Sequence, residues 1–178
     1  MIKFSTLLKE SKGKSLSVFD FDHTLATADQ WVYVHTATGE IKQLDPGEFA
    51  LYELQPGERF DFSEFDKMMR NPRLIQRNAK KLKTELERAA KTKSHKVTIL
   101  TARGIGFPVR HFLKSVGLDT YVVPLGSADP QAKANWIEQH ILKGYTTIFF
   151  TDDSIKNLEA VRSLKQKYPH IRLLVRKA

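Results

Sequence analysis

The sequence predicts an α/β fold with a doubly wound, mainly parallel five-stranded sheet and a small cap domain inserted after the first strand. Two observations predict the sheet: five short apolar segments occur along the chain, and helical patterns separate them. Near-continuous apolar runs are expected of strands covered on both faces. The insertion is predicted by the range 26–95, which is far longer than the single helix that usually joins two such strands.

Each predicted core element has its own signal. The expected strands are short, apolar and β-branched, and lie at 14–21, 96–103, 120–126, 145–153 and 171–175. The expected helices lie at 107–117, 129–144 and 154–168. The second helix has Asp129 as a candidate N-cap, Pro130 at its first helical position and Gly144 after its end. This alternation assigns 1–25 and 96–178 to the core, with right-handed crossovers.

The range 26–95 is expected to form the cap. Two extended runs around "TATGE" predict a hairpin at 31–44, Pro-Gly pairs mark turns at 46–47 and 56–57, and a long helix at 72–91 returns the chain to the core. The cap is rich in aromatic residues, namely Trp31, Tyr33, Phe49, Tyr52, Phe60, Phe62 and Phe65. We expect most of them to form the core of the cap; the alternative is that one or two of them stack on a nucleobase.

Composition excludes several classes of protein. The chain has 178 residues, of which 41% are hydrophobic, so global disorder is not expected. It has no cysteine, which excludes disulfides and thiolate chemistry. No apolar run approaches the ~18 residues of a membrane span, and the opening "MIKFSTLLKES" is too short and polar for a signal peptide. We expect a soluble, cytoplasmic protein whose Ile2, Phe4, Leu7 and Leu8 form an amphipathic turn on the core.

The chain is strongly basic, with a formal net charge of +9. The excess lies in two segments, 77–96 and 171–178. A run of charge on a helix is most often a solvated face. The alternative is a polyanionic partner such as nucleic acid, which a basic protein binds through counterion release.

Polar residues gather at three strand ends. The first strand ends on Asp20 and Asp22, the second on Thr101 and Arg103, and the fourth on Asp152 and Asp153, while Lys133 lies near the start of the helix after the third. Ligand sites of open α/β sheets lie beyond the carboxyl ends of their strands. Four carboxylates in one cleft repel each other unless a cation neutralises them, and Mg²⁺ prefers oxygen ligands. We therefore expect a Mg²⁺ site held by these aspartates, which in turn attracts a phosphate.

The segments "DFDHTL", "LTAR", Lys133 and "FFTDDSIKN" resemble, in order, the four motifs of the haloacid dehalogenase (HAD) superfamily of phosphohydrolases. The resemblance covers the core from Leu16 to about Val175, and the insertion lies where that superfamily carries a cap. The stretch "LQPGERFDFSEFD", together with "TADQWVYV", also resembles a phage-encoded HAD-like group.

The resemblance implies a role for each motif. Asp20 is the implied nucleophile, which forms an aspartyl-phosphate, and Asp22 is the implied general acid and base. The implied Mg²⁺ ligands are Asp20, one or both of Asp152 and Asp153, and the backbone carbonyl of Asp22. Thr101 and Lys133 are implied to bind the phosphoryl oxygens.

Four further residues are open between two interpretations. Arg103 is either a phosphate clamp or a surface residue, and Asn157 either orients Asp152 or Asp153 or is an exposed helix residue. His23 is expected to be exposed beside the loop, with substrate contact as the alternative. Thr24 is expected to cap the turn.

The resulting hypothesis is a Mg²⁺-dependent phosphatase acting on a phosphomonoester, with a nucleotide or a nucleic-acid phosphate end as the favoured substrate. The alternative from another class is a catalytically quiet nucleic-acid-binding or scaffold protein with a HAD-like core. A receiver-like phosphoacceptor domain is disfavoured because the third strand, "TYVVPLG", ends without a carboxylate. The segment "KGKS" is similar to the end of a nucleotide-binding loop. A nucleotide-binding function is disfavoured because a strand follows this segment instead of a helix.

Overall fold

Five parallel strands form the central sheet of the fold. The computed structural model describes residues 13–178, so the amphipathic turn expected before them lies outside the described residues. The strands are β1 (Lys14–Phe19), β7 (His95–Thr101), β8 (Tyr121–Pro124), β9 (Tyr145–Asp152) and β10 (Arg172–Lys177), in the spatial order β10-β9-β1-β7-β8. All four neighbouring pairs are parallel. The predicted α/β fold with a five-stranded parallel sheet is confirmed.

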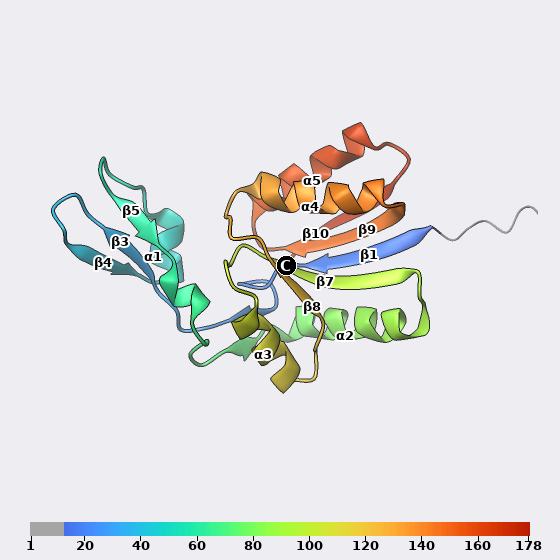
Figure 1. Cartoon of the computed structure of the whole chain (residues 1–178), viewed down its shortest axis with the longest axis horizontal. Coiled ribbons are helices and arrows are strands. Elements are labelled where there is room, and N and C mark those ends of the chain that lie inside the picture. Colours follow the sequence, from blue (N-terminus) through green and yellow to red (C-terminus); the bar gives the residue numbers. More distant parts are fainter. Residues whose placement is uncertain (1–12) are drawn as a thin grey trace, which may run out of the picture.

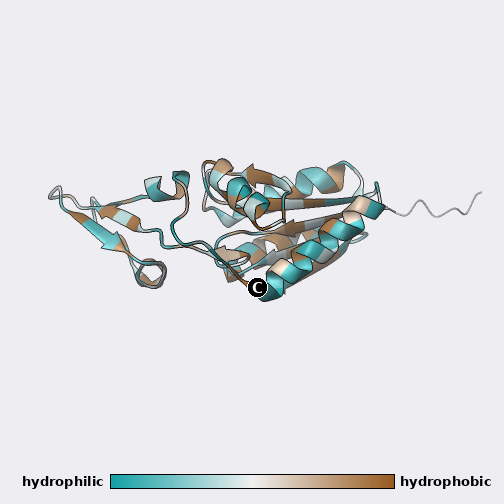
Figure 2. Ribbon diagram, turned by 90° about the horizontal axis from the view of Figure 1, so that it is seen from below, coloured by the Kyte–Doolittle hydropathy of each residue, from teal (hydrophilic) through white to brown (hydrophobic). Residues whose placement is uncertain are grey.

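Helices cover both faces of this sheet (Figure 1). Helices α4 (Pro130–Leu142) and α5 (Ile155–Lys167) lie on one face, and α2 (Gln76–Lys91) and α3 (Phe107–Ser115) lie on the other. Asp129 caps α4 as expected, because its side chain accepts a hydrogen bond from the Gln131 amide. Coloured by hydropathy, the strands are mainly brown between helices with teal outer surfaces (Figure 2).

The apolar strand residues form two cores, one on each face. Leu16, Val18, Ile148 and Phe150 pack with the buried residues of α4 and α5. Phe19, Phe21 and Ile99 pack with α2 and α3. Strands buried on both faces explain why the apolar runs in the sequence are nearly continuous.

The inserted segment forms a separate, smaller sheet. Strands β3 (Val32–His35), β4 (Ile41–Leu44) and β5 (Arg59–Asp61) pair antiparallel in the order β4-β3-β5, so the predicted hairpin is confirmed. A short helix α1 (Pro46–Leu51) and a 3₁₀ turn η2 (Ser63–Asp66) accompany them. This sheet projects away from the core in both ribbon views (Figures 1 and 2).

A two-stranded ladder joins the inserted segment to the core. Strand β2 (Ala26–Thr27) pairs antiparallel with β6 (Arg73–Leu74) where the chain leaves and rejoins the core. Helix α2 falls within the range 26–95, which the sequence assigns to the cap. It nevertheless packs against the central sheet through Ala79 and Leu82, because these residues form its apolar stripe. The independent part of the insertion therefore ends before α2.

The aromatic residues of the insertion pack mainly on one another. Phe60 lies with its ring centroid 5.0 Å from that of Phe49 and 5.8 Å from that of Phe62, and Phe62 lies 6.2 Å from Phe65. Phe49, Phe60 and Phe65, together with Tyr52, pack against Val32, Val34 and Leu44 in a third small core. Among residues 13–178, no helix is long and apolar enough to cross a membrane.

Candidate functional site

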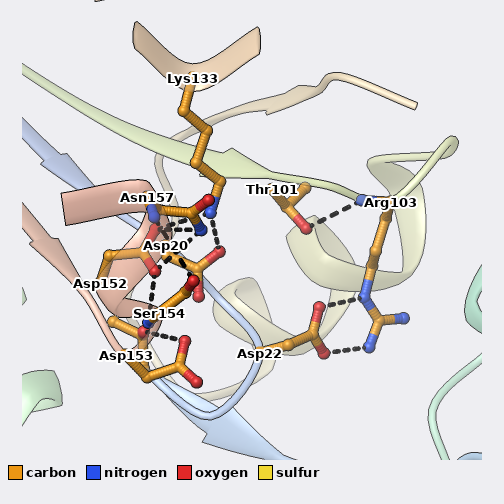
Figure 3. A network of polar contacts seen from close by, with 10 residues as sticks. Asp20, Asp22, Thr101, Arg103, Lys133, Asp152, Asp153, Ser154 and Asn157 are labelled. Carbon is orange, nitrogen blue, oxygen red and sulfur yellow. Dashed lines mark hydrogen bonds and ion pairs between the residues drawn. The ribbon is translucent and has the colours of Figure 1, made fainter. Parts of the chain in front are cut away.

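The candidate site lies at the carboxyl end of the central sheet (Figure 3). Asp20 follows the last residue of β1, Thr101 is the last residue of β7, and Asp152 is the last residue of β9. Parallel neighbouring strands bring these ends together, since β1 lies between β7 and β9. Lys133 reaches the same place from the first turn of α4.

Lys133 bridges two of the aspartates. Its Nζ lies 2.6 Å from Asp20 Oδ1 and 2.8 Å from Asp152 Oδ2. All three side chains are buried, with exposed fractions of 4%, 7% and 0%. A buried lysine is held charged by such partners: burial alone lowers its pKa, but Asp20 and Asp152 together raise the pKa of Lys133 above its ordinary value.

Three aspartates form a possible cation site. Asp20, Asp152 and Asp153 each offer a carboxylate oxygen, and these oxygens lie within 4.8 Å of one another. Lys133 neutralises only one of the three charges, so the group is two charges short of neutrality. Oxygen ligands and a residual negative charge fit a hard divalent cation such as Mg²⁺.

The pKa values of two of these aspartates are raised, mainly by burial. Burial raises the pKa of Asp20 to about 7, with Asp152 and Asp22 adding to the rise and Lys133 opposing it. Burial, and then the charge of Asp152, also raises the pKa of Asp153. Raised carboxyl pKa values mean that the site favours a bound positive charge, either a proton or a metal ion.

Asp152 is held rigidly by the start of α5. The side-chain nitrogen Nδ2 of Asn157 donates to the two carboxylate oxygens of Asp152 at 3.0 and 3.1 Å. The Ser154 backbone N–H donates to Asp152 Oδ1 at 2.8 Å. Of the two roles left open for Asn157, the structure shows the orienting one, directed at Asp152. Asp153 is oriented by Thr24, whose Oγ1 donates to it at 3.3 Å.

Asp22 points away from this group and pairs with Arg103 (Figure 3). Arg103 Nε and Nη2 donate to the two carboxylate oxygens of Asp22 at 2.9 and 2.6 Å. The structure thus brings together three of the four aspartates predicted as metal ligands. The carboxylate of Asp22 lies outside the group, because a bidentate arginine fixes it.

Arg103 is buried and also contacts the inserted segment. Its exposed fraction is 4%, so it is not a surface residue. Its guanidinium donates to Gln30 Oε1 at 2.7 Å and to the backbone carbonyl of Phe65 at 2.9 Å, and it lies 4.9 Å from the centroid of the Phe65 ring. Sequence reasoning missed Gln30, because an isolated glutamine in a loop carries no signal of its position.

Thr101 and His23 flank the site. Thr101 is fully buried, and its Oγ1 accepts a hydrogen bond from the Arg103 amide at 3.3 Å. His23 is exposed, as expected, and has a positive φ of 56° in the turn between Asp22 and Thr24. A left-handed residue is unusual outside glycine, and here it closes the turn, with the His23 amide bonded to the Ala26 carbonyl at 2.9 Å.

A hollow of about 440 Å³ lies between this turn and the inserted segment. Its lining includes His23, Trp31 and Arg73. Trp31 is the aromatic residue of the insertion that lines the hollow, whereas Phe49, Phe60 and Phe62 pack on one another. A flat aromatic ring that lines a hollow is a suitable platform for stacking a nucleobase.

Comparison of the chain with protein-family models, curated proteins and solved structures finds no match. The site's geometry and the sequence motifs are therefore the basis for any assignment of function.

Proposed function

We propose that this chain is a Mg²⁺-dependent phosphatase of the HAD type, which hydrolyses a phosphomonoester through an aspartyl-phosphate. The observation that carries the proposal is the convergence of Asp20, Asp152 and Asp153 with the buried Lys133. One cationic side chain among three carboxylates favours a further cation. A site that holds a divalent cation then attracts a phosphate dianion.

Asp20 is the proposed nucleophile. One of its carboxylate oxygens attacks phosphorus, a P–O bond forms, and the bond from phosphorus to the ester oxygen breaks. Lys133 holds Asp20 Oδ1 in place and offsets the charge that gathers on the phosphoryl oxygens. Asp20, Asp152, Asp153 and the backbone carbonyl of Asp22 would hold Mg²⁺, which would neutralise charge on the phosphate. Thr101 is the proposed hydroxyl donor to the phosphoryl group.

Asp22 is the proposed general acid and base. It gives a proton to the departing ester oxygen, then takes one from the water that attacks the aspartyl-phosphate, which releases inorganic phosphate and restores Asp20. The bidentate pair with Arg103 orients Asp22. One of the two hydrogen bonds from Arg103 to Asp22 must break when the Asp22 carboxyl group is protonated.

The inserted segment is the proposed cap. It carries Trp31 to the hollow beside His23, and it is joined to Arg103 through Gln30 and Phe65. A cap excludes water and selects the substrate. Trp31 favours a substrate with a flat group, such as a nucleotide.

Hydrolysis of an aryl phosphate, with Mg²⁺ and with a chelator, tests the reaction class. Wild type should turn over only with the metal, and Asp20→Asn should lose turnover. Acid quenching during turnover should leave a phosphoryl group on the peptide that contains Asp20, as detected by mass spectrometry. Full activity in Asp20→Asn would overturn the mechanism.

The second candidate is a catalytically quiet nucleic-acid-binding protein with the same core. The net charge of +9 favours it. It predicts salt-dependent binding of nucleic acid with no release of phosphate from a panel of mononucleotides, sugar phosphates and phosphorylated oligonucleotides. Metal-dependent turnover of any member of the panel would exclude it.

A further inference from the structure

Part of the central sheet carries no helix within residues 13–178. Helices α4 and α5 cover one face of β9 and β10, and on the opposite face α2 packs against β7. The register aligns two rows of side chains on that opposite face, namely Ser17, Phe149 and Leu174, and Phe19, Thr151 and Arg176. Ser17 and Phe149 face α2, since Ser17 bonds Glu85 at 2.7 Å and the Arg88 guanidinium lies 5.8 Å from the Phe149 ring centroid.

This uncovered face is the floor of a cavity of about 850 Å³, which we call the basic groove. Helix α2 forms one wall with Lys81 and Glu85, and Phe149, Leu174 and Arg176 form the floor. The cavity continues around the edge of β10 to Arg162 and Lys165 of α5. The groove is therefore an open channel with apolar patches on its floor and cationic side chains along its sides.

The charge of the groove is positive. Lys81 and Arg176 line the groove, and neither forms an ion pair within residues 13–178. Partial burial, and then the charges of Arg176 and Arg77, lower the pKa of Lys81. Glu85 is the acidic residue of the wall; it pairs with Arg88 at 3.7 Å and accepts a hydrogen bond from Ser17 at 2.7 Å. Uncompensated cations in a channel attract a polyanion.

The groove ends at the same edge of the sheet as the candidate active site. Phe19 and Thr151 line it, and the next residues along the two strands are Asp20 and Asp152. Arg176 stands beside Thr151 in the strand register. Successive side chains of a strand point to opposite faces, so the carboxylates of Asp20 and Asp152, one residue or about 3.3 Å further along the strands, lie across the edge of the sheet from the end of the groove.

We propose that the basic groove binds a single-stranded nucleic acid and leads its phosphorylated end to Asp20. Lys81 and Arg176 contact backbone phosphates, and the half-buried ring of Phe149 supports a base. Stacking on an aromatic ring together with cationic contacts along a strand is the usual way in which proteins bind single strands without sequence preference. This inference rests on the proposed phosphatase function and names its substrate class.

Two other occupants fit the charge less well. The chain's own residues 1–12 contain Lys3, Lys9 and Lys12 against Glu10, so their charge has the same sign as the groove. A second copy added along β10 would place Arg172 and Arg176 beside their equivalents, which is unfavourable for edge-to-edge pairing.

The first test measures binding without catalysis. A fluorescent single-stranded oligonucleotide of about 12 nucleotides without a terminal phosphate is titrated with protein at several salt concentrations, and its anisotropy is followed. Lys81→Ala combined with Arg176→Ala should weaken binding about tenfold at low salt and reduce the salt slope by about 1.4, or two phosphates at about 0.7 each. Phe149→Leu should weaken binding about tenfold through lost stacking.

Lys83→Ala combined with Lys114→Ala is the matched control. Lys83 is exposed on α2 and Lys114 is exposed on α3, and neither lines the groove. The control should bind as wild type does. Equal loss in the control and in the groove variant, or no binding by wild type, would overturn the proposal. Binding that appears only after deletion of residues 1–12, or a dimer that Leu174→Asp dissociates, would also overturn it in favour of the other occupants.

The second test separates the groove from the chemistry. The ratio of kcat/KM for a phosphorylated oligonucleotide to that for an aryl phosphate should fall at least about tenfold in the Lys81 and Arg176 double variant. An unchanged ratio would overturn the groove proposal while leaving the phosphatase intact. Absence of turnover on both substrates, with oligonucleotide binding retained, would instead overturn the proposed function.

Discussion

Arg103 donates hydrogen bonds to both carboxylate oxygens of Asp22, from Nε at 2.9 Å and from Nη2 at 2.6 Å. The same guanidinium donates to Gln30 and to the backbone of Phe65 in the inserted segment. One buried cation therefore joins the proposed acid and base to the proposed cap. The position of Asp22 depends on the position of the insertion, because both share this partner.

Arg103→Lys should lower both activity and stability. Lysine keeps the charge but lacks the planar guanidinium. It therefore cannot donate to both carboxylate oxygens of Asp22 and also to Gln30 and Phe65. The free energy of unfolding should fall by about 2–4 kcal/mol, since buried acceptors lose their donor. Urea denaturation and aryl phosphate turnover measure the two effects. Arg110→Lys, in an exposed pair with Asp119, is the control and should change stability by less than about 0.5 kcal/mol.

Asp20→Asn should stabilise the metal-free protein at high pH. The pKa of Asp20 is raised to about 7 in the folded chain, so between about pH 4 and 7 the folded state binds more protons than the unfolded state. The contribution of Asp20 to stability therefore falls as pH rises through this window. Asparagine does not titrate, so the variant keeps its stability over the same range. The stability advantage of the variant in chelator should grow from pH 5 to pH 8, reaching about 2–4 kcal/mol. An advantage that shrinks with rising pH would contradict the burial of an unneutralised carboxylate.

Mg²⁺ should stabilise the wild-type chain at pH 8. A ligand present at about a hundred times its Kd adds about 2.7 kcal/mol to the stability of the state that binds it. Thermal unfolding with Mg²⁺ and with chelator measures this shift. It should shrink in Asp153→Asn, which removes one of the three converging carboxylates, and it should shrink at pH 5, where Asp20 holds a proton instead. An equal shift in Asp153→Asn would place the metal elsewhere.

Lys133→Met should be among the most destabilising changes in the core. It leaves Asp20 and Asp152 buried without their cation, and breaking such a pair costs about 3–5 kcal/mol. Asp20→Asn in the same chain should restore part of the loss, because it removes one of the stranded charges. Urea denaturation of the two single variants and the double variant gives the coupling energy. Strictly additive effects would show that the pair does not interact.

The strand ends were predictable because they depend on chain order. Asp20, Thr101 and Asp152 each end an apolar run, and parallel strands place such ends on one edge. Lys133 was predictable for the same reason, as a residue in the first turn of a crossover helix. Both predictions require only the periodicity of apolar residues, which locates the strands and helices in the sequence.

The direction of Asp22 was not predictable in this way. Its distance from Asp20 in sequence is two residues, yet its partner, Arg103, is 81 residues away, and Gln30 reaches Arg103 from the insertion. Such a partnership depends on tertiary packing, which leaves no local pattern. The same holds for α2, whose apolar stripe shows that the helix packs on something but not that its partner is the central sheet.

The ladder of β2 and β6 has a consequence for how the chain can change. Ala26 faces Leu74 and Thr27 faces Arg73, so the arm formed by 28–72 departs and returns at points about one strand spacing apart, or ~4.8 Å. A module with such closely spaced ends is interchangeable: a tight turn or a different arm could bridge the gap without disturbing the sheet behind it. A replacement arm would have to bring acceptors of its own for Arg103 and an apolar contact in place of Met69, which packs against the core.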